Sequence, residues 1–143
     1  MKRSSFVKRG LVIGVCFGIV LGLWASNSLV FGHARFIGAN IENGKVYTVA
    51  ELPDRLELMF EGELTPRSQV YVFSVPSTYL VDKGDVKIEE EHGGGYGHEH
   101  KSKLSVGLNK EKLTDGLYQV RWIAVDAEHG AFVEGGFFFA IKG

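Results

Sequence analysis

Apolar side chains recur at every second position through most of this chain, far more often than at every third or fourth. This alternation is typical of strands that bury one face and expose the other to water. The clearest case is residues 54–61, where Leu56, Leu58 and Phe60 share one predicted buried face. Helical periodicity is weak, with residues 109–113 as the best candidate. The pattern therefore predicts an all-β domain.

Turn signals divide the alternating region into about seven short strands. Residues 70–75 are apolar on both faces until a proline ends them, which predicts a central strand. Residues 117–126 and 132–141 predict a later strand pair, and two adjacent glycines in the second strand predict a bulge or a close backbone approach. We expect a seven-stranded, antiparallel, Greek-key β-sandwich of the immunoglobulin-like kind. The low-complexity stretch 89–100 (EEEHGGGYGHEH) is predicted to be a mobile loop.

The first 32 residues have the three-part composition of a secretory signal peptide. Residues 1–9 are basic, residues 11–24 form an uncharged apolar run, and residues 25–32 are small and mildly polar. The apolar run is shorter than the roughly 20 residues that a membrane-spanning helix needs. We therefore expect export to the periplasm or another extracytoplasmic compartment.

The small residues at the end of this segment suit cleavage after Gly32, which would leave a domain of residues 33–143 beginning at His33. Cleavage after Ala25 is one alternative. Retention of residues 1–32 as a membrane anchor is another, and it is the only membrane contact that the sequence predicts.

The charge distribution argues against nucleic acid as a partner. All 17 acidic residues follow Gly32, together with 12 of the 16 basic ones, so this part has a net charge of −5. No basic patch remains to neutralise phosphates. The single cysteine, Cys16, lies in the predicted signal peptide, so the exported domain has neither a disulfide nor a thiolate ligand.

A histidine at the new N-terminus has two donor atoms for a metal ion. If cleavage frees His33, its α-amine and its imidazole can chelate one ion together. The pKa of an α-amine lies near 7.7 to 8.0, so a metal displaces its proton at modest cost around neutral pH. Two nitrogens in one plane suit Cu(II), which prefers tetragonal N and O ligands.

Further ligands occur in one predicted turn, where Asp126, Glu128 and His129 supply carboxylates and an imidazole. The first strand of a sandwich can lie beside the last ones, so His33 and this turn can meet at one end of the domain. Three more histidines fall in the low-complexity stretch, which either collects a divalent ion weakly or is a solvated linker: His92, His98 and His100.

Four motifs follow one another in a specific order. They are His33-Ala34 at the predicted mature start, Pro-x-x-Leu-x-Leu-x-Phe at 53–60, Gly-x-Tyr-x-Val-x-Trp at 116–122 and Gly-x-Phe-x-Phe at 135–139. In their order and spacing, the chain resembles the CopC-type copper-binding and copper-resistance proteins of the bacterial periplasm. The resemblance covers nearly the whole predicted mature chain.

This resemblance implies a cupredoxin-like sandwich that holds Cu(II) through the N-terminal histidine, an aspartate and a second histidine. His33 and His129 match the two histidines. The usual turn of the family is Asp-Gly-His, whereas here Asp126 precedes His129 by three positions. We favour Asp126 over Glu128, since neighbours on an extended strand point to opposite faces. Met59 is the only methionine after the signal, so the methionine-rich Cu(I) site of some members is expected to be absent.

The leading hypothesis is a non-enzymatic Cu(II) carrier that buffers copper or delivers it to an inner-membrane copper transporter. A copper-dependent oxygenase with an N-terminal histidine chelate is one alternative, although about 111 residues leave little area for a substrate platform. A metal-free, membrane-anchored β-sandwich that contacts another protein is the other alternative.

Overall fold

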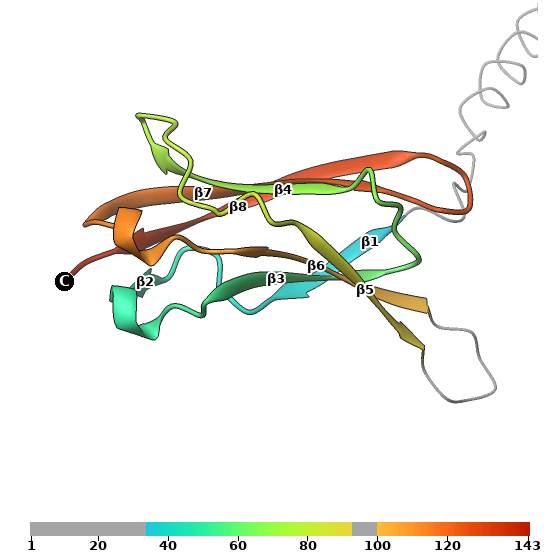
Figure 1. Ribbon diagram of the computed structural model, residues 1–143, viewed down its shortest axis with the longest axis horizontal. Coiled ribbons are helices and arrows are strands. Elements are labelled where there is room, and N and C mark those ends of the chain that lie inside the picture. Colours follow the sequence, from blue (N-terminus) through green and yellow to red (C-terminus); the bar gives the residue numbers. More distant parts are fainter. Residues whose placement is uncertain (1–33, 93–99) are drawn as a thin grey trace, which may run out of the picture. The chain divides into compact units, whose positions relative to one another are not determined.

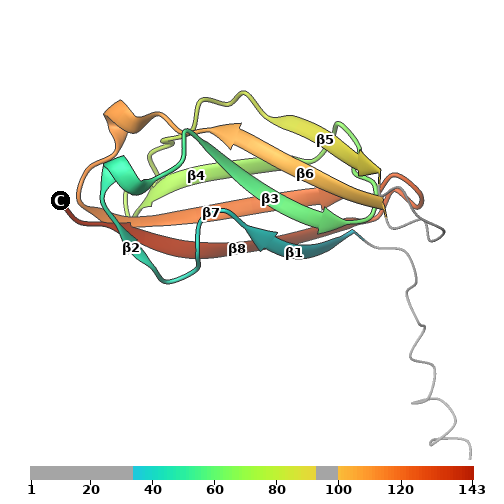
Figure 2. The same cartoon turned by 90° about the horizontal axis from the view of Figure 1, so that it is seen from below.

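The alternating segments form two four-stranded sheets that pack face to face (Figures 1 and 2). The order in the first sheet is β1 (Arg35–Ala39), β3 (Arg55–Glu61), β6 (His100–Gly107) and β5 (Lys87–His92). The order in the second sheet is β2 (Val46–Tyr47), β8 (Phe132–Ile141), β7 (Gly116–Val125) and β4 (Gln69–Val75). The predicted β-sandwich is confirmed, with eight strands in the described part of the chain in place of the predicted seven.

The computed structural model describes residues 34–92 and 100–143. The predicted signal peptide (residues 1–32), His33 and His98 lie outside these ranges. Within the described ranges, no helix has the length and apolar character needed to cross a membrane. Two short 3-10 turns are described, Val49–Glu51 and Lys110–Lys112, and the second occupies the segment predicted as the best helical candidate.

Neighbouring strands run antiparallel, as predicted, except that β2 pairs with β8 in parallel. β2 has only two residues, too few for an alternating pattern to reveal it from the sequence. The longest ladder joins β7 and β8 over ten residue pairs, from Gly116↔Ile141 to Val125↔Phe132. This hairpin carries the predicted metal-binding turn at its tip.

The inward faces of the two sheets form the core. β3 alternates between buried and half-buried residues along its whole length, with the three predicted inward residues fully buried. Phe36 of β1 stacks on Trp122 of β7 across the sandwich, with 4.5 Å between ring centroids. Phe137 and Phe139 of β8 are also buried, as predicted. Each fully buried side chain of this size stabilises the fold by about 1.5–3 kcal/mol.

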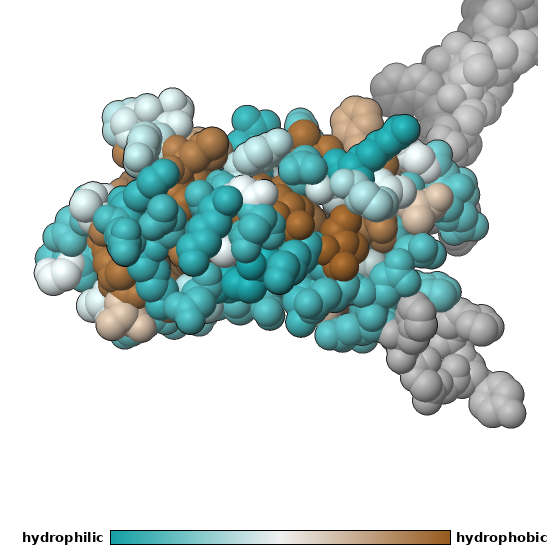
Figure 3. All heavy atoms as spheres, viewed as in Figure 1, coloured by the Kyte–Doolittle hydropathy of each residue, from teal (hydrophilic) through white to brown (hydrophobic). Residues whose placement is uncertain are grey.

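The prediction that residues 70–75 form a central strand is wrong, because β4 is the outer strand of its sheet. Its outer edge is covered by the chain that follows it. Val81 donates its backbone N–H to Val72 O at 2.9 Å, and Val72 donates its own to Asp82 Oδ2 at 2.8 Å. This pairing covers the backbone edge of β4, while its outward-facing Tyr71 and Phe73 remain partly exposed and line a surface pocket with Leu80. Figure 3 shows a band of hydrophobic surface between β4 and β6 on this side of the sandwich.

The glycine pair in β8 permits a close approach, one of the two predicted explanations. A Cβ on Gly135 would lie 2.3 Å from Cζ2 of Trp122, and a Cβ on Gly136 would lie 2.5 Å from Val120 O. The β7–β8 register is unbroken here. A shift in strand register, of the kind a bulge produces, lies instead in β1, between Phe36 and Gly38.

The prediction of a loop over residues 89–100 is wrong at both ends. β5 continues to His92 and β6 begins at His100, while residues 93–99 are outside the described ranges. Polar pairs replace apolar alternation in this ladder, as in Glu89↔Lys103, where Lys103 Nζ lies 3.2 Å from Glu89 Oε2. Sequence periodicity therefore did not reveal the strand.

Candidate metal centre

The predicted metal-binding turn joins β7 to β8 and closes on itself through its backbone. Asp126 donates its N–H to Ala131 O at 2.8 Å, and Gly130 donates its N–H to Asp126 O at 3.0 Å. Gly130 has φ of +65°, in the left-handed region that only glycine adopts at little cost. The turn therefore has one defined shape, which determines where its side chains lie.

The Asp126 carboxylate is the anchor of this turn. Its side chain is only 6% exposed, whereas the His129 side chain is 47% exposed. Asp126 Oδ2 accepts the backbone N–H of His129 at 2.8 Å and lies 3.1 Å from Nδ1 of the same residue. The carboxylate thus holds both the backbone and the ring of His129.

The spacing of these two side-chain atoms suits one metal ion. Metal–nitrogen and metal–oxygen bonds of about 2.0 Å, set at right angles, place neighbouring ligand atoms about 2.8 Å apart. The 3.1 Å between Asp126 Oδ2 and His129 Nδ1 is close to that separation. The two atoms are therefore close enough to bind one divalent ion together.

Glu128 is placed less favourably. Its side chain is 78% exposed, and its Oε1 lies 3.9 Å from Nε2 of His129. The geometry favours Asp126 over Glu128, but for a different reason from the predicted one. Residues 127–129 form a turn and not an extended strand, so strand alternation does not distinguish the two acids.

The chain next to His33 approaches this turn through one short segment after β3. A Cβ on Gly62 would lie 3.5 Å from the Cα of Ala34, and Ala127 donates its N–H to Glu63 O at 2.9 Å. Ala34 is itself buried, at 2% exposed. Ala34, the first described residue, therefore contacts a segment that pairs with the turn.

This link between the N-terminal end of the domain and the turn differs from the predicted one. β1 lies in the opposite sheet from β7 and β8, so it faces these strands across the core and does not pair with them. The link is made by the segment after β3, where Leu64 forms an antiparallel bridge with Asp126.

Sequence analysis did not identify Ser102, which holds that segment in place. Ser102 is fully buried; its hydroxyl donates to Gly62 O at 2.9 Å and accepts the Leu64 N–H at 3.2 Å. A buried serine on a strand has no distinctive spacing or neighbours in the sequence, so no signal marks it.

Within residues 34–92 and 100–143, no three histidine, cysteine, aspartate or glutamate side chains converge as a ready-made metal site. The described part of the predicted site consists of Asp126 and His129. The remaining predicted ligand, His33, lies outside the described ranges.

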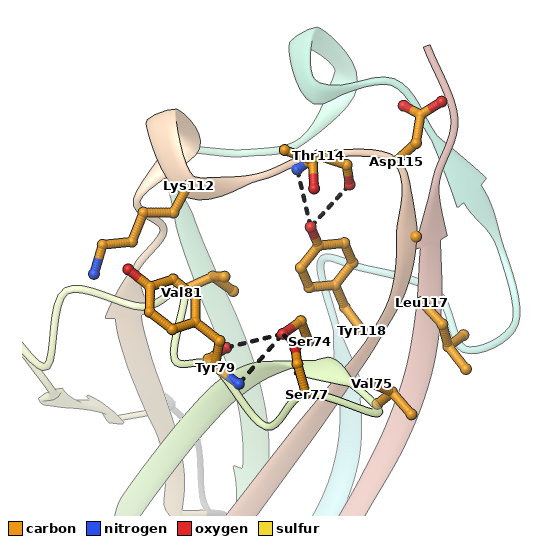
Figure 4. Close-up of a pocket in the computed structure, with 11 residues that line it drawn as sticks. Ser74, Val75, Ser77, Tyr79, Val81, Lys112, Thr114, Asp115, Leu117 and Tyr118 are labelled. Atoms are coloured by element: carbon orange, nitrogen blue, oxygen red, sulfur yellow. Dashed lines mark hydrogen bonds between the residues drawn. The ribbon is translucent and has the colours of Figure 1, made fainter.

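A surface pocket of about 550 Å³ lies where β7 begins, at the other end of that strand from the turn (Figure 4). Its polar groups are largely paired with one another. The Tyr118 hydroxyl bonds to both the N–H and the C=O of Thr114, and Tyr79 donates its N–H to Ser74 Oγ. No histidine lines it, so this pocket does not form part of the metal centre.

Comparison with protein families matches residues 38–142 to the CopC domain. Comparison with solved structures finds neutral ceramidase from Pseudomonas aeruginosa, at 16% sequence identity and a TM-score of 0.44. That match covers 76% of this chain and 19% of the ceramidase chain, so this chain spans about a fifth of it. Comparison with curated proteins gives no match.

Proposed function

The chain belongs to the CopC domain family of copper-binding, copper-resistance proteins, and on this premise we propose that it binds one Cu(II) ion outside the cytoplasm. The proposed ligands are His33, Asp126 and His129. The observation that carries the proposal is the 3.1 Å separation of Asp126 Oδ2 and His129 Nδ1, in a turn that pairs with the segment contacting Ala34.

The proposed ligand set contains nitrogen and oxygen only. The α-amine and imidazole of His33 would supply two nitrogens, His129 a third, and Asp126 an oxygen. Such a tetragonal set suits Cu(II), while a blue-copper site needs a cysteine thiolate. We therefore expect a weak d–d absorption band and no intense blue colour.

The exposures of Asp126 and His129 support a carrier role. Asp126 is buried and rigidly held, whereas the His129 ring is about half exposed. An exposed ligand lets a partner approach the ion and exchange it, which suits buffering or delivery to an inner-membrane copper transporter. We propose this non-enzymatic role with export to the periplasm, guided by the signal-like residues 1–32.

The decisive experiment compares two N-termini. The processed protein beginning at His33 is titrated with Cu(II) against a competing chelator, beside the same protein with its N-terminal amine acetylated. The first form is expected to bind one ion tightly. The acetylated form should lose affinity by about 100-fold or more, because it has no free α-amine to close a chelate ring with the imidazole. Equal affinities would refute the proposal.

The same copper-loaded protein tests the oxygenase alternative. Incubation with peroxide and chitin or cellulose is expected to yield no oxidised oligosaccharides. Their appearance would favour the enzyme over the carrier.

A further inference from the structure

We propose that the outer face of the β2–β8–β7–β4 sheet, the upper layer in Figure 1, binds a second copy of this chain about a two-fold axis. The strand register sets which residues share this face, because it aligns Val75 with Leu117 and Leu117 with Ala140. Nine large hydrophobic side chains are exposed in the described part of the chain, and six of them lie on this face. These six are Val46, Tyr71, Leu117, Ile123, Phe132 and Phe138.

The outer face of the other sheet has the opposite character. Its strands are joined by ion pairs, Arg35 with Glu61 and Lys103 with both Glu57 and Glu89. An antiparallel sheet that faces water on one side normally has polar residues there, so this charged face is an ordinary solvated surface. The apolar outer face of the β2–β8–β7–β4 sheet is unusual by comparison, and exposed apolar patches of this kind are typical of interaction sites.

The charges on the apolar face point to a second copy as its occupant. Arg121 and Glu134 are the only charged residues at outward positions of its four strands, and the pair is neutral. Arg121 Nη2 lies 3.8 Å from Glu134 Oε2, with both side chains more than half exposed. A two-fold axis in the plane of the face that passes between them brings Arg121 of each copy opposite Glu134 of the other. The face is therefore complementary to itself, as an isologous interface must be.

The shape of the face also suits packing against another sheet. Arg121 lines two hollows in it, one of about 310 Å³ beside Tyr71 and one of about 200 Å³ beside Gly136. Two aromatic rings stand out from the same face, since Phe132 is 70% exposed and Phe138 is 41% exposed. Projecting rings next to hollows allow the side chains of two facing sheets to interdigitate.

The size of the face indicates how tightly two copies bind. With strands about 4.8 Å apart and about 3.3 Å per residue, its three long strands cover roughly 500 Å² before the relief of the side chains is counted. A stable interface of standard size buries about 800 Å² per partner, and weaker contacts bury less than about 600 Å². We therefore expect a reversible dimer with a Kd in the micromolar range.

The test is sedimentation equilibrium of the processed protein between about 1 and 500 µM. A chelator is present, so the result does not depend on the proposed Cu(II) site. The weight-average mass is expected to rise with concentration from that of one chain toward that of two. Leu117→Lys and Ile123→Lys place a charge on the apolar face and should each weaken dimerisation by about tenfold or more.

Charge reversal tests the two-fold arrangement directly. Arg121→Glu and Glu134→Arg should each lose self-association, because like charges then meet across the axis. An equimolar mixture of these two variants should dimerise again, since opposite charges then meet at both contacts. Lys87→Glu is the control, because it reverses an exposed charge on the outer face of the other sheet, and it should dimerise as wild type does.

Two results would overturn the proposal. One is a protein that stays monomeric at 500 µM, and the other is a mixture of Arg121→Glu and Glu134→Arg that associates no better than either variant alone. A monomer that sediments with phosphatidylethanolamine–phosphatidylglycerol vesicles would assign the apolar face to a membrane surface instead.

Discussion

Asp126 Oδ2 lies 3.1 Å from His129 Nδ1 and accepts the backbone N–H of His129 at 2.8 Å. One oxygen atom thus fixes the position of a residue three places along the chain. The arrangement lets a divalent ion compete with a proton for the position between oxygen and nitrogen. It also explains how a turn with two residues between acid and histidine, one more than in Asp-Gly-His, can still bring their ligand atoms together.

Replacing Asp126 with asparagine should weaken copper binding without unfolding the turn. The amide oxygen can still accept the His129 N–H, but the negative charge that attracts Cu(II) is lost. We expect the affinity to fall by about 10- to 100-fold in a chelator-competition titration. Glu128→Gln is the matched control, because its side chain is exposed and 3.9 Å from the ring, and it should change the affinity by about twofold at most. A larger loss in Glu128→Gln than in Asp126→Asn would assign the carboxylate ligand to Glu128.

Gly130→Ala should destabilise the domain through its backbone conformation. At φ of +65°, an alanine Cβ crowds the neighbouring carbonyl, which costs about 1–2 kcal/mol. The free energy of unfolding, measured by urea titration, should fall by that amount. Gly38→Ala is the control, since its added Cβ would meet no atom within 4 Å. Equal losses in the two variants would show that the left-handed turn is not the cause.

Gly135→Ala should destabilise the domain by a different mechanism, which is overpacking. Its Cβ would stand 2.3 Å from the buried Trp122 ring, so the indole must move within an aromatic cluster that includes Phe36. Such a shift typically costs about 1–3 kcal/mol. Trp122 is the only tryptophan after the predicted signal, so its fluorescence should report the movement directly. A wild-type emission spectrum and wild-type stability together would contradict this prediction.

Strands with one apolar face were predictable from the sequence, whereas strands stabilised in other ways were not. β3 and β7 alternate because one face is buried and the other is solvated, and this alternation is visible in the residue order. β5 is a polar strand held by pairing with β6, so no apolar period marks it. The place of β4 at an edge depends on the later residues 79–82 that cover it, which is a tertiary feature.

The same distinction applies to the metal centre. The turn that brings Asp126 and His129 together was predictable, because it falls between two predicted strands. Ser102 was not, because its role lies in the hydrogen bonds to Gly62 and Leu64, which are 40 and 38 positions away in the sequence. Residues that act by holding other segments show no sequence signal unless their partners are already known.

The ion pair between Asp85 and Arg55 predicts how stability responds to acid. The Gly107 N–H donates to Asp85 Oδ1 at 2.8 Å and Arg55 Nη1 lies 2.6 Å from Oδ2. The Gly107 hydrogen bond first, and then the Arg55 guanidinium, hold the pKa of Asp85 below its ordinary value of 3.8. A carboxyl with a lowered folded-state pKa stabilises the fold above its unfolded-state pKa and loses that contribution as the pH falls through the folded-state value.

Asp85→Asn should therefore be less stable than wild type at neutral pH, and the difference should shrink below about pH 3.8. Protonation makes the wild-type side chain neutral, so the two proteins then carry the same charge at this position. The measurement is the free energy of urea unfolding across pH 2.5 to 7. Glu111→Gln, at an exposed position on a 3-10 turn, is the surface control. A difference between Asp85→Asn and wild type that stays constant down to pH 2.5 would show that the Asp85 charge does not stabilise the fold.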